Sequence, residues 1–229
     1  MSRTLDPEAH ALRRESFVDV AQRHIQAKGY EQMSVQDVLD ELGASRGAFY
    51  HYFDSKGALL EAVVERMVDG AAATLAPLVA DPNVPALEKL EGVFAGLARW
   101  KAQRTELVSA LLSVWLSDEN AIVRDKVRRG MAMRLAPLLA AIVRQGRDEG
   151  LFTARAGDDD VARVLSSLIQ GANETAVELY VARQADQVSP AVVERTLAAY
   201  GEAFERLLGL PEGSLTVIDG AILSQWYGR

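Results

Sequence analysis

The apolar residues of this chain recur every three or four positions along almost its whole length. Between residues 56 and 79 the pattern runs through Leu59, Leu60, Val63, Val64, Met67, Val68, Ala71 and Leu75. This spacing places apolar side chains on one face of a helix. No segment shows the convincing alternation of apolar and polar residues that is typical of a half-buried strand. The sequence therefore predicts an all-α fold.

Capping residues and glycines divide this pattern into nine or ten helices. The first is expected to end at Gly29, and the second to run from a capping box at Ser34 to Gly43. Ser45 is expected to cap a third helix that carries Phe49 and Phe53, and Ser55 a long fourth one. Further helices are predicted near 86–103, 105–117, 120–148, 158–184 and 189–208. Residues 214–227 also show helical spacing, at Val217, Ile218, Ile222, Leu223 and Trp226, so we expect this tail to pack on the body or on a partner.

Composition excludes several kinds of protein. Apolar residues make up 49% and charged residues 25% of the chain, as in ordinary globular proteins. There is no cysteine, which excludes disulfides, thiolate metal sites and cysteine nucleophiles. The polar N-terminus does not resemble a secretory signal, and no apolar run approaches the 18 to 20 residues that span a bilayer. A cytoplasmic protein with no membrane partner is expected.

A tight glycine-containing turn at residues 42–45 joins two short predicted helices, which is the arrangement of a helix-turn-helix. The segment after it, GASRGAFYHYFDSKG at residues 43–57, contains five consecutive rings. Phe49 and Phe53 lie four residues apart and are expected in the core. Tyr50 shares the outward face with Arg46 and Gly47. Such a face suits phosphates and base edges, since Arg can bind guanine and Tyr can donate to a phosphate.

A simpler interpretation remains open for this segment. A capped helix pair with surface tyrosines also occurs in proteins that do not bind DNA. The charge is unfavourable to nonspecific binding, because the chain carries a net charge of −7 and residues 1–60 hold seven cations against nine anions. Any nucleic-acid site must therefore be a local patch.

The segment MSVQDVLDELGASRGAFYHYFDSKGALL at residues 33–60 strongly resembles the DNA-binding region of TetR-type transcriptional regulators. The pattern of a small residue, Ser, a basic residue and Gly, followed by the aromatic cluster and Ser-Lys, is specific to that family. The resemblance covers roughly residues 10–65. One departure is Gly57, where the family often has an acidic residue, and this glycine should loosen the first turn of the fourth helix.

The resemblance implies a helix-turn-helix DNA-binding domain at residues 1–56 and a larger helical domain for ligand sensing and dimerisation at 57–229. It implies a homodimer that binds double-stranded, pseudo-palindromic operator DNA, acts as a transcriptional repressor and responds to an unidentified small-molecule effector. The matching phosphate contacts are Ser34, Ser45, Tyr50, Tyr52 and Lys56. The matching base-edge or groove residues are Gln36, Arg46, Gly47, Ala48 and His51.

The remaining helices offer candidates for an effector pocket and for a dimer interface. The pocket candidates are Met67, Phe94, Trp100, Trp115, Met131, Phe152, Gln170, Asn173 and Glu174, since large apolar residues with a few polar groups are typical of ligand sites. The alternative is that the aromatic and Met residues fill the core and the polar residues are solvated. The broad apolar faces of 158–184 and 189–208 favour a four-helix interface between two subunits.

An enzyme is not expected. The chain lacks the phosphate-binding motifs GxxxxGK[ST] and GxGxxG, the zinc motif HExxH and the nucleophile motif GxSxG. All three histidines lie in the first 60 residues, so the larger domain has none for acid–base chemistry. We expect no cofactor, no metal and no catalytic residue. The alternative to a DNA-binding regulator is an all-α small-molecule-binding bundle or enzyme without DNA binding.

Overall fold

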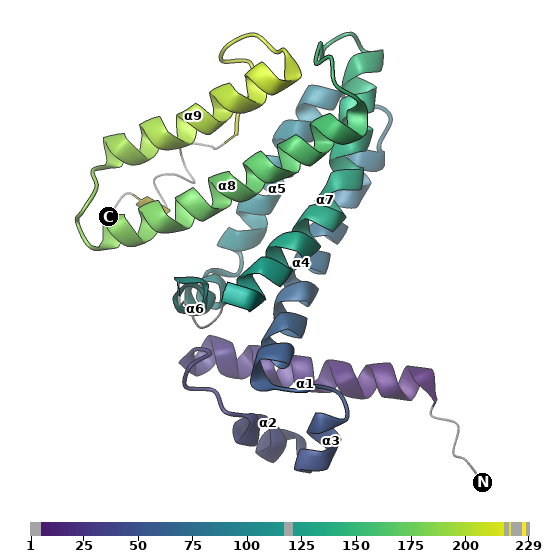
Figure 1. Cartoon of the computed structure of the whole chain (residues 1–229), viewed down its shortest axis with the longest axis vertical. Coiled ribbons are helices and arrows are strands. Elements are labelled where there is room, and N and C mark those ends of the chain that lie inside the picture. The colour runs from purple at the N-terminus through teal and green to yellow at the C-terminus, as the bar shows by residue number, and fades with distance from the viewer. Residues whose placement is uncertain (1–5, 117–120, 218–219, 221–225, 228–229) are drawn as a thin grey trace. The chain divides into compact units, whose positions relative to one another are not determined.

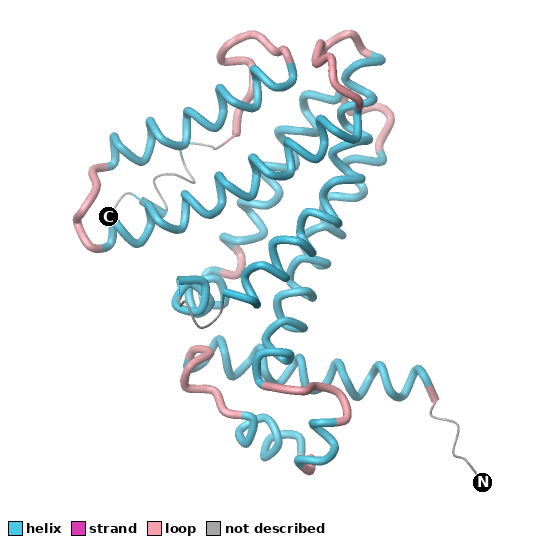
Figure 2. The backbone as a smooth tube through the Cα atoms, viewed as in Figure 1, coloured by secondary structure: helices cyan, strands magenta, loops and turns pink. Residues whose placement is uncertain are grey.

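The computed structural model describes residues 6–116, 121–217, 220 and 226–227, without the side chains of residues 113–116, 122–123 and 127. Within these residues the chain forms nine helices and no strand, so the all-α prediction is confirmed (Figures 1 and 2). The helices are α1 (Pro7–Lys28), α2 (Val35–Leu42), α3 (Arg46–Tyr50), α4 (Lys56–Ala80), α5 (Ala86–Ala102), α6 (Thr105–Leu116), α7 (Ala121–Asp148), α8 (Asp158–Gln184) and α9 (Pro190–Leu208). No helix in the described residues has both the length and the apolarity needed to cross a membrane.

Local capping explains where the first helices begin and end. The Ser34 hydroxyl accepts a hydrogen bond from the Asp37 backbone N–H, and the Asp37 carboxylate accepts one from the Ser34 backbone N–H, which completes the predicted capping box. Gly43 ends α2 in the left-handed region at φ 57°, a conformation that costs glycine little. Ser45 caps α3 through the backbone N–H of Ala48.

Two expected boundaries differ from the structure. The third helix was expected to carry Phe53, but α3 ends at Tyr50, and Phe53 follows in a turn whose backbone N–H still bonds to the Phe49 carbonyl at 3.0 Å. In the C-terminal tail, residues 214–217 are not helical, whereas Gly220, Trp226 and Tyr227 are. Ile218, Ile222 and Leu223 lie outside the described residues.

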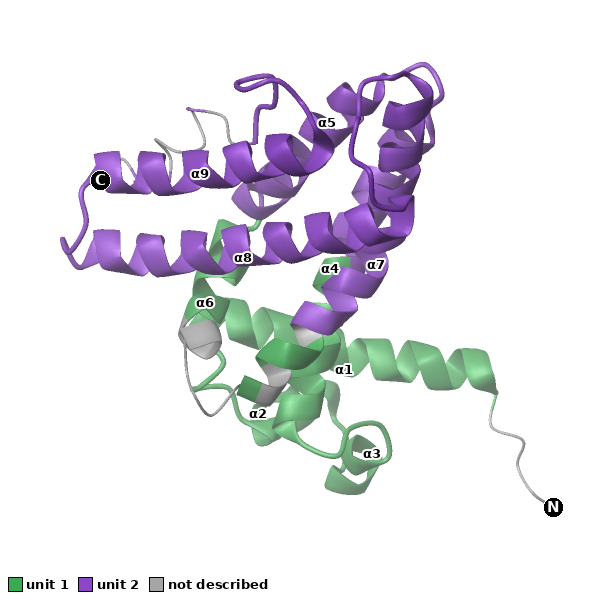
Figure 3. Ribbon diagram, turned by 45° about the horizontal axis from the view of Figure 1, so that its top comes forward, with its two compact units in different colours: residues 1–68, 104–127 green, residues 69–103, 128–229 purple. Residues whose placement is uncertain are grey.

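The chain divides into two compact units (Figure 3). One unit contains residues 1–68 and 104–127, and the other contains 69–103 and 128–229. The chain passes from one unit to the other within α4, between α5 and α6, and within α7. The first unit thus includes α6, which the sequence assigns to the larger domain; the functional boundary at residue 56 stays a prediction.

The core of the first unit is built around α1, which packs against α2 and α6. Phe17 and Ile25 of α1, Val38 of α2 and Phe49 of α3 are fully shielded from solvent, as is Leu59 at the start of α4. Two ion pairs hold α2 against α1: Lys28 Nζ lies 2.8 Å from Asp37 Oδ2, and Arg23 Nη2 lies 2.6 Å from Glu41 Oε1.

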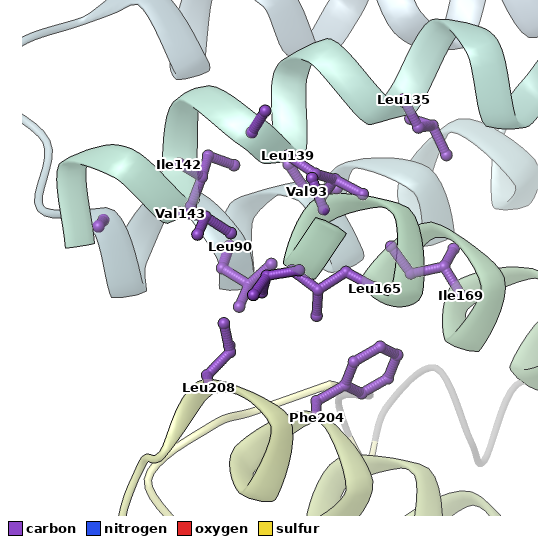
Figure 4. Packing of buried hydrophobic residues seen from close by; sticks show 14 of the residues in the cluster. Leu90, Val93, Leu135, Leu139, Ile142, Val143, Leu165, Ile169, Phe204 and Leu208 are labelled. Carbon is purple, nitrogen blue, oxygen red and sulfur yellow. The ribbon is translucent and has the colours of Figure 1, made fainter. Parts of the chain in front are cut away.

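The core of the second unit joins α4, α5, α7, α8 and α9. Figure 4 shows Leu90 and Val93 of α5 meeting side chains from α7, α8 and α9, among them Leu139, Leu165 and Phe204. Helices α8 and α9 also pack directly against each other. Gly92 of α5 permits close packing against α4, because a Cβ on this residue would lie 2.4 Å from Leu78 Cδ2.

A buried lysine of α5 hydrogen-bonds to residues of α4 and α7 in this unit. Lys89 of α5 is only 2% exposed, and its ammonium donates to the Val79 carbonyl at 2.7 Å and to Gln145 Oε1 at 2.6 Å. The Glu149 carboxylate accepts from the Ala86 backbone N–H at 3.0 Å. The network satisfies a carbonyl at the end of α4 and an N–H at the start of α5, which are groups that helices leave unpaired.

Candidate nucleic-acid interface

The turn between α2 and α3 is held by backbone bonds and by the rings behind it. The Ala44 backbone N–H donates to the Leu39 carbonyl at 2.9 Å, which follows from the left-handed Gly43. Phe49 is fully buried, with its ring centroid 5.9 Å from that of Phe17 and 5.8 Å from that of Phe53. These aromatic contacts fix the rotation of α3 about its axis and therefore decide which residues face outward.

The outward face of α3 consists of exposed residues, as predicted. Arg46 and Gly47 are exposed in the first turn, and Tyr50 is 57% exposed although it is large and aromatic. Among the described residues, Arg46 makes no hydrogen bond or ion pair, so its guanidinium keeps all its donors. A Cβ on Gly47 would meet only the Ser45 hydroxyl, at 3.9 Å, so the fold itself does not require glycine there. Ala48 is half-buried.

The hydroxyls of the two capping serines differ in what they can still donate. Ser45 accepts from the Ala48 backbone N–H at 3.2 Å, which leaves its own proton available. Ser34 already donates its proton to Asp37 Oδ2 at 2.7 Å, so a phosphate contact by this hydroxyl would require that bond to break. Gln36, exposed in the first turn of α2, donates from Nε2 to Asp40 at 2.7 Å.

The rings after α3 turn back toward α1. Tyr52 is half-buried, with its centroid 5.7 Å from that of Phe17 and 4.6 Å from that of His10. His51 is exposed and lies 5.0 Å from Tyr52 and 5.4 Å from His10, both measured between centroids. His10 was not among the predicted residues. Its contact crosses about forty positions of sequence, and no local pattern indicates it.

Lys56 begins α4 and is not free in this structure. Its ammonium lies 4.1 Å from the centroid of the Tyr30 ring and donates to the Glu31 carbonyl at 3.3 Å. Partial burial lowers the pKa of Lys56. Both partners are weaker than a carboxylate, so a phosphate can compete for this ammonium.

Two of the three acidic residues of α2 form ion pairs with cations of α1. The hydrogen bond from Lys28, helped by those from Ser34, holds the pKa of Asp37 well below its usual range. The hydrogen bond from Arg23 likewise lowers the pKa of Glu41. Each of these pairs joins one anion to one cation, so neither carboxylate presents an uncompensated negative charge beside α3, although the net charge of the first 60 residues is unchanged.

The pocket candidates are scattered over several environments. Phe94 and Phe152 belong to the core of the second unit, where packing accounts for their size: Phe94 lies 5.1 Å from Phe204 between centroids, and Phe152 covers Gly146. Met131 packs at the edge of that core. Met67 is half-buried in the first unit. The side chain of Trp115 lies outside the described residues.

Three of the remaining candidates lie on α8, and one lies on α5. Asn173 accepts a hydrogen bond from Lys101 of α5 at 2.6 Å. Lys101 was not among the candidates predicted from the sequence. Trp100 is half-buried beside that lysine, and its Nε1 would lie 4.0 Å from a Cβ on Gly70 of α4. Gln170 is half-buried, and Glu174 is exposed.

Residues of this site match a known family of regulators. The model of the family "Bacterial regulatory proteins, tetR family" matches residues 17–63, which include α2, α3 and the start of α4. The repressor DhaR of Mycobacterium sp. (strain GP1) is 25% identical over 69% of this chain and 79% of its own length. The regulator EthR of Mycobacterium tuberculosis is 27% identical over 67% of this chain and 82% of its own length.

The fold agrees as well. The complex of SmeT with triclosan superposes with a TM-score of 0.59 at 21% identity and covers 91% of this chain and 98% of its own. SmeT is the repressor of a multidrug efflux pump of Stenotrophomonas maltophilia. At this identity the likeness concerns the fold alone. The motif in α2 and α3, the family match and the matches to curated regulators lead to one conclusion: this chain is a TetR-type DNA-binding transcriptional regulator, and not an enzyme.

Proposed function

We propose that this regulator is a repressor that binds a pseudo-palindromic operator as a homodimer and releases it when a small-molecule effector binds. The observation that carries the proposal is the exposed, unengaged face of α3, with Arg46 and Tyr50 aligned on a helix that buried rings hold in place. A symmetric pair of such helices suits two major-groove sites about 34 Å apart, or a multiple of that.

Proteins similar to this chain are named repressors, which supports repression over activation. DhaR is named a repressor, and SmeT is a repressor that has been crystallised with triclosan. The dimer is argued from α8 and α9, which pack together while Val164 and Val181 of α8 stay 46% and 37% exposed. An apolar helix face of this kind suits contact with a second copy of the chain.

The proposed mechanism runs through α4. This helix is unbroken from Lys56 to Ala80 and belongs to both units, so a displacement of its second half is transmitted to the residues next to α3. An effector that favours the non-binding arrangement by about 1–3 kcal/mol weakens operator affinity about 5- to 150-fold.

The chemistry of each exposed side chain determines whether we assign it to a phosphate or to a base edge of the DNA. Ser45, Tyr50, Tyr52 and Lys56 serve as phosphate ligands through neutral hydroxyls and one ammonium. Arg46 is the base-reading residue, because its guanidinium, which no described residue engages, matches the acceptors of guanine. Ser34, Gln36, Gly47, Ala48 and His51 complete the surface at its edges.

A footprint of the full chain on the DNA flanking its own gene tests the proposal. We expect a protected two-fold site, and an all-α binding bundle or enzyme would protect nothing. Within that site, Arg46→Ala should lose about 10-fold or more in affinity and relax the preference at one base position per half-site. Tyr50→Phe should weaken every sequence alike, because only a phosphate contact is removed.

The matched control for Arg46→Ala is Arg155→Ala, at an exposed position between α7 and α8. It should leave affinity and preference unchanged. The base-reading role of Arg46 is refuted if its variant weakens all sequences equally, and the phosphate role of Tyr50 is refuted if its variant changes base preference.

A further inference from the structure

In the second unit, Lys101 hydrogen-bonds to Asn173 and pairs with no anion among the described residues. Lys101 Nζ donates to Asn173 Oδ1 at 2.6 Å, and among the described residues this neutral amide is its only hydrogen-bond partner. Burial lowers the pKa of Lys101 to about 8, so the ammonium is desolvated but still charged at neutral pH. A desolvated charge with only a neutral partner is costly, and proteins rarely keep one without a use.

The two side chains also keep donors for a ligand. An ammonium has three protons, of which Asn173 takes one. Since Lys101 can only donate, the Asn173 oxygen must face it, and the amide nitrogen keeps two N–H donors that no described residue accepts. The arrangement offers one positive charge and several donors in one place, which suits a single carboxylate.

The surroundings of the pair are apolar. Lys101 follows Leu97 by one helical turn, and Leu97 packs against the core of this unit. Asn173 follows Ile169 by one turn, and Ile169 is 3% exposed. Trp100 is adjacent. The nearest acid along α8, Glu174, is exposed and makes no ion pair with Lys101. The pair therefore marks a polar point at the margin of a hydrophobic core.

We propose that Lys101 and Asn173 bind the carboxylate of an apolar monocarboxylic acid, which is the effector class of this regulator. The proposal rests on the effector response in the proposed function and adds its chemistry. A dianion such as a phosphate monoester would leave an excess negative charge in the same surroundings, and a cation would be repelled. The competing explanation is that the hydrogen bond only ties α5 to α8.

The test compares three acids with their neutral amides. Decanoate, 4-phenylbutyrate and biphenyl-4-carboxylate are titrated into the full chain at pH 7 by calorimetry, each beside its primary amide. We expect at least one acid to bind 10-fold or more tightly than its amide. Lys101→Met should remove that preference and leave amide binding within about 2-fold. The matched control is Lys126→Met, at an exposed lysine paired with Glu61. This variant should keep the preference for the acid over the amide.

Asn173→Asp separates ligand binding from a structural tie. The new carboxylate keeps the bond to Lys101 and neutralises it, so the protein should melt no lower than wild type yet lose the preference for acids. Asn173→Ala removes the tie but leaves the charge, and should retain the preference. A purely structural hydrogen bond predicts no preference for acids in wild type or in either variant, and a lower melting temperature for Asn173→Ala.

The proposal is overturned if no acid binds, if acids and amides bind equally, or if the preference survives in Lys101→Met or in Asn173→Asp. DNA binding by the same wild-type preparation is measured without probes. Protein that binds DNA but shows no acid preference overturns only the carboxylate site, whereas protein that binds no DNA overturns the proposed function.

Discussion

The lowered pKa of Lys101 makes the folding stability of the protein depend on pH. Below about pH 8 its desolvated ammonium is charged in the folded state, and in the unfolded chain a lysine stays protonated up to about pH 10.4. Between these values the unfolded chain binds more protons at this residue, so stability rises with pH. The penalty is complete below about pH 8 and is relieved as the pH approaches 10.

This sign gives a pH-dependent prediction. The free energy of unfolding of wild type, minus that of Lys101→Met, should increase as the pH goes from 7 to 9.5, with urea unfolding as the measurement. The free energy of unfolding of wild type, minus that of Lys126→Met, should change less over this range, because the Lys126 ammonium is exposed. A Lys101 difference that stays constant across this range would show that the ammonium is well solvated.

Residues were predictable from the sequence where their surroundings are local. Phe49 and Phe53 were expected in the core and Tyr50 outside it, and the structure confirms all three, because helical spacing alone decides them. Neither the Lys101–Asn173 pair nor the approach of His10 to His51 could be predicted, since each joins helices far apart in the chain.

At the scale of the helices, capping residues gave most boundaries to within one or two positions. The exception is the end of α3, where the backbone of Phe53 continues to bond to Phe49 after the helix has ended. Packing between helices is less visible in sequence. Phe152 lies over Gly146 of α7, and a Cβ on that glycine would come within 2.2 Å of Phe152 Cδ2.

The same substitution should therefore have opposite effects in two helices. Gly146→Ala should lower the free energy of unfolding by about 1–3 kcal/mol, because the Phe152 ring is buried and must move. Gly57→Ala in the first turn of α4 should raise it by up to about 1 kcal/mol, since its Cβ would meet only the Ser55 hydroxyl at an ordinary 3.5 Å. Chemical denaturation of both variants measures the two changes.

Each variant controls the other, because alanine improves helix propensity equally at both sites. A stabilised Gly146→Ala would mean that Phe152 can leave its place at little cost. A destabilised Gly57→Ala would mean that the glycine which departs from the family pattern has a role of its own at the start of α4.

At the scale of the whole molecule, no pattern in the sequence indicates that α6 joins the first unit. The partner of its apolar face is α1, about ninety residues earlier, and amphipathic spacing does not say which helix a face will meet. The consequence is that α4 and α7 both belong to two units, so the DNA-binding residues are connected to the larger unit by three segments of chain rather than one linker.

The distribution of charge over the molecule leads to a prediction about salt. With a net charge of −7, binding must rest on the local patch, in which most proposed phosphate ligands are neutral hydroxyls and only Arg46 and Lys56 are cations. A dimer would then place about four cations on the DNA. At pH 8, where histidines are neutral, the logarithm of the binding constant against the logarithm of salt concentration should have a slope of about −4.

Fluorescence anisotropy with operator DNA between 50 and 300 mM salt measures this slope. Lys56→Met removes two cations from the dimer, so the slope should become shallower by about 2. A wild-type slope steeper than about −7 would require further cations on the DNA, such as Arg13 or Arg14 of α1, and would mean that the interface extends well beyond α2 and α3. An unchanged slope in Lys56→Met would instead show that the ammonium stays on the Tyr30 ring when DNA binds.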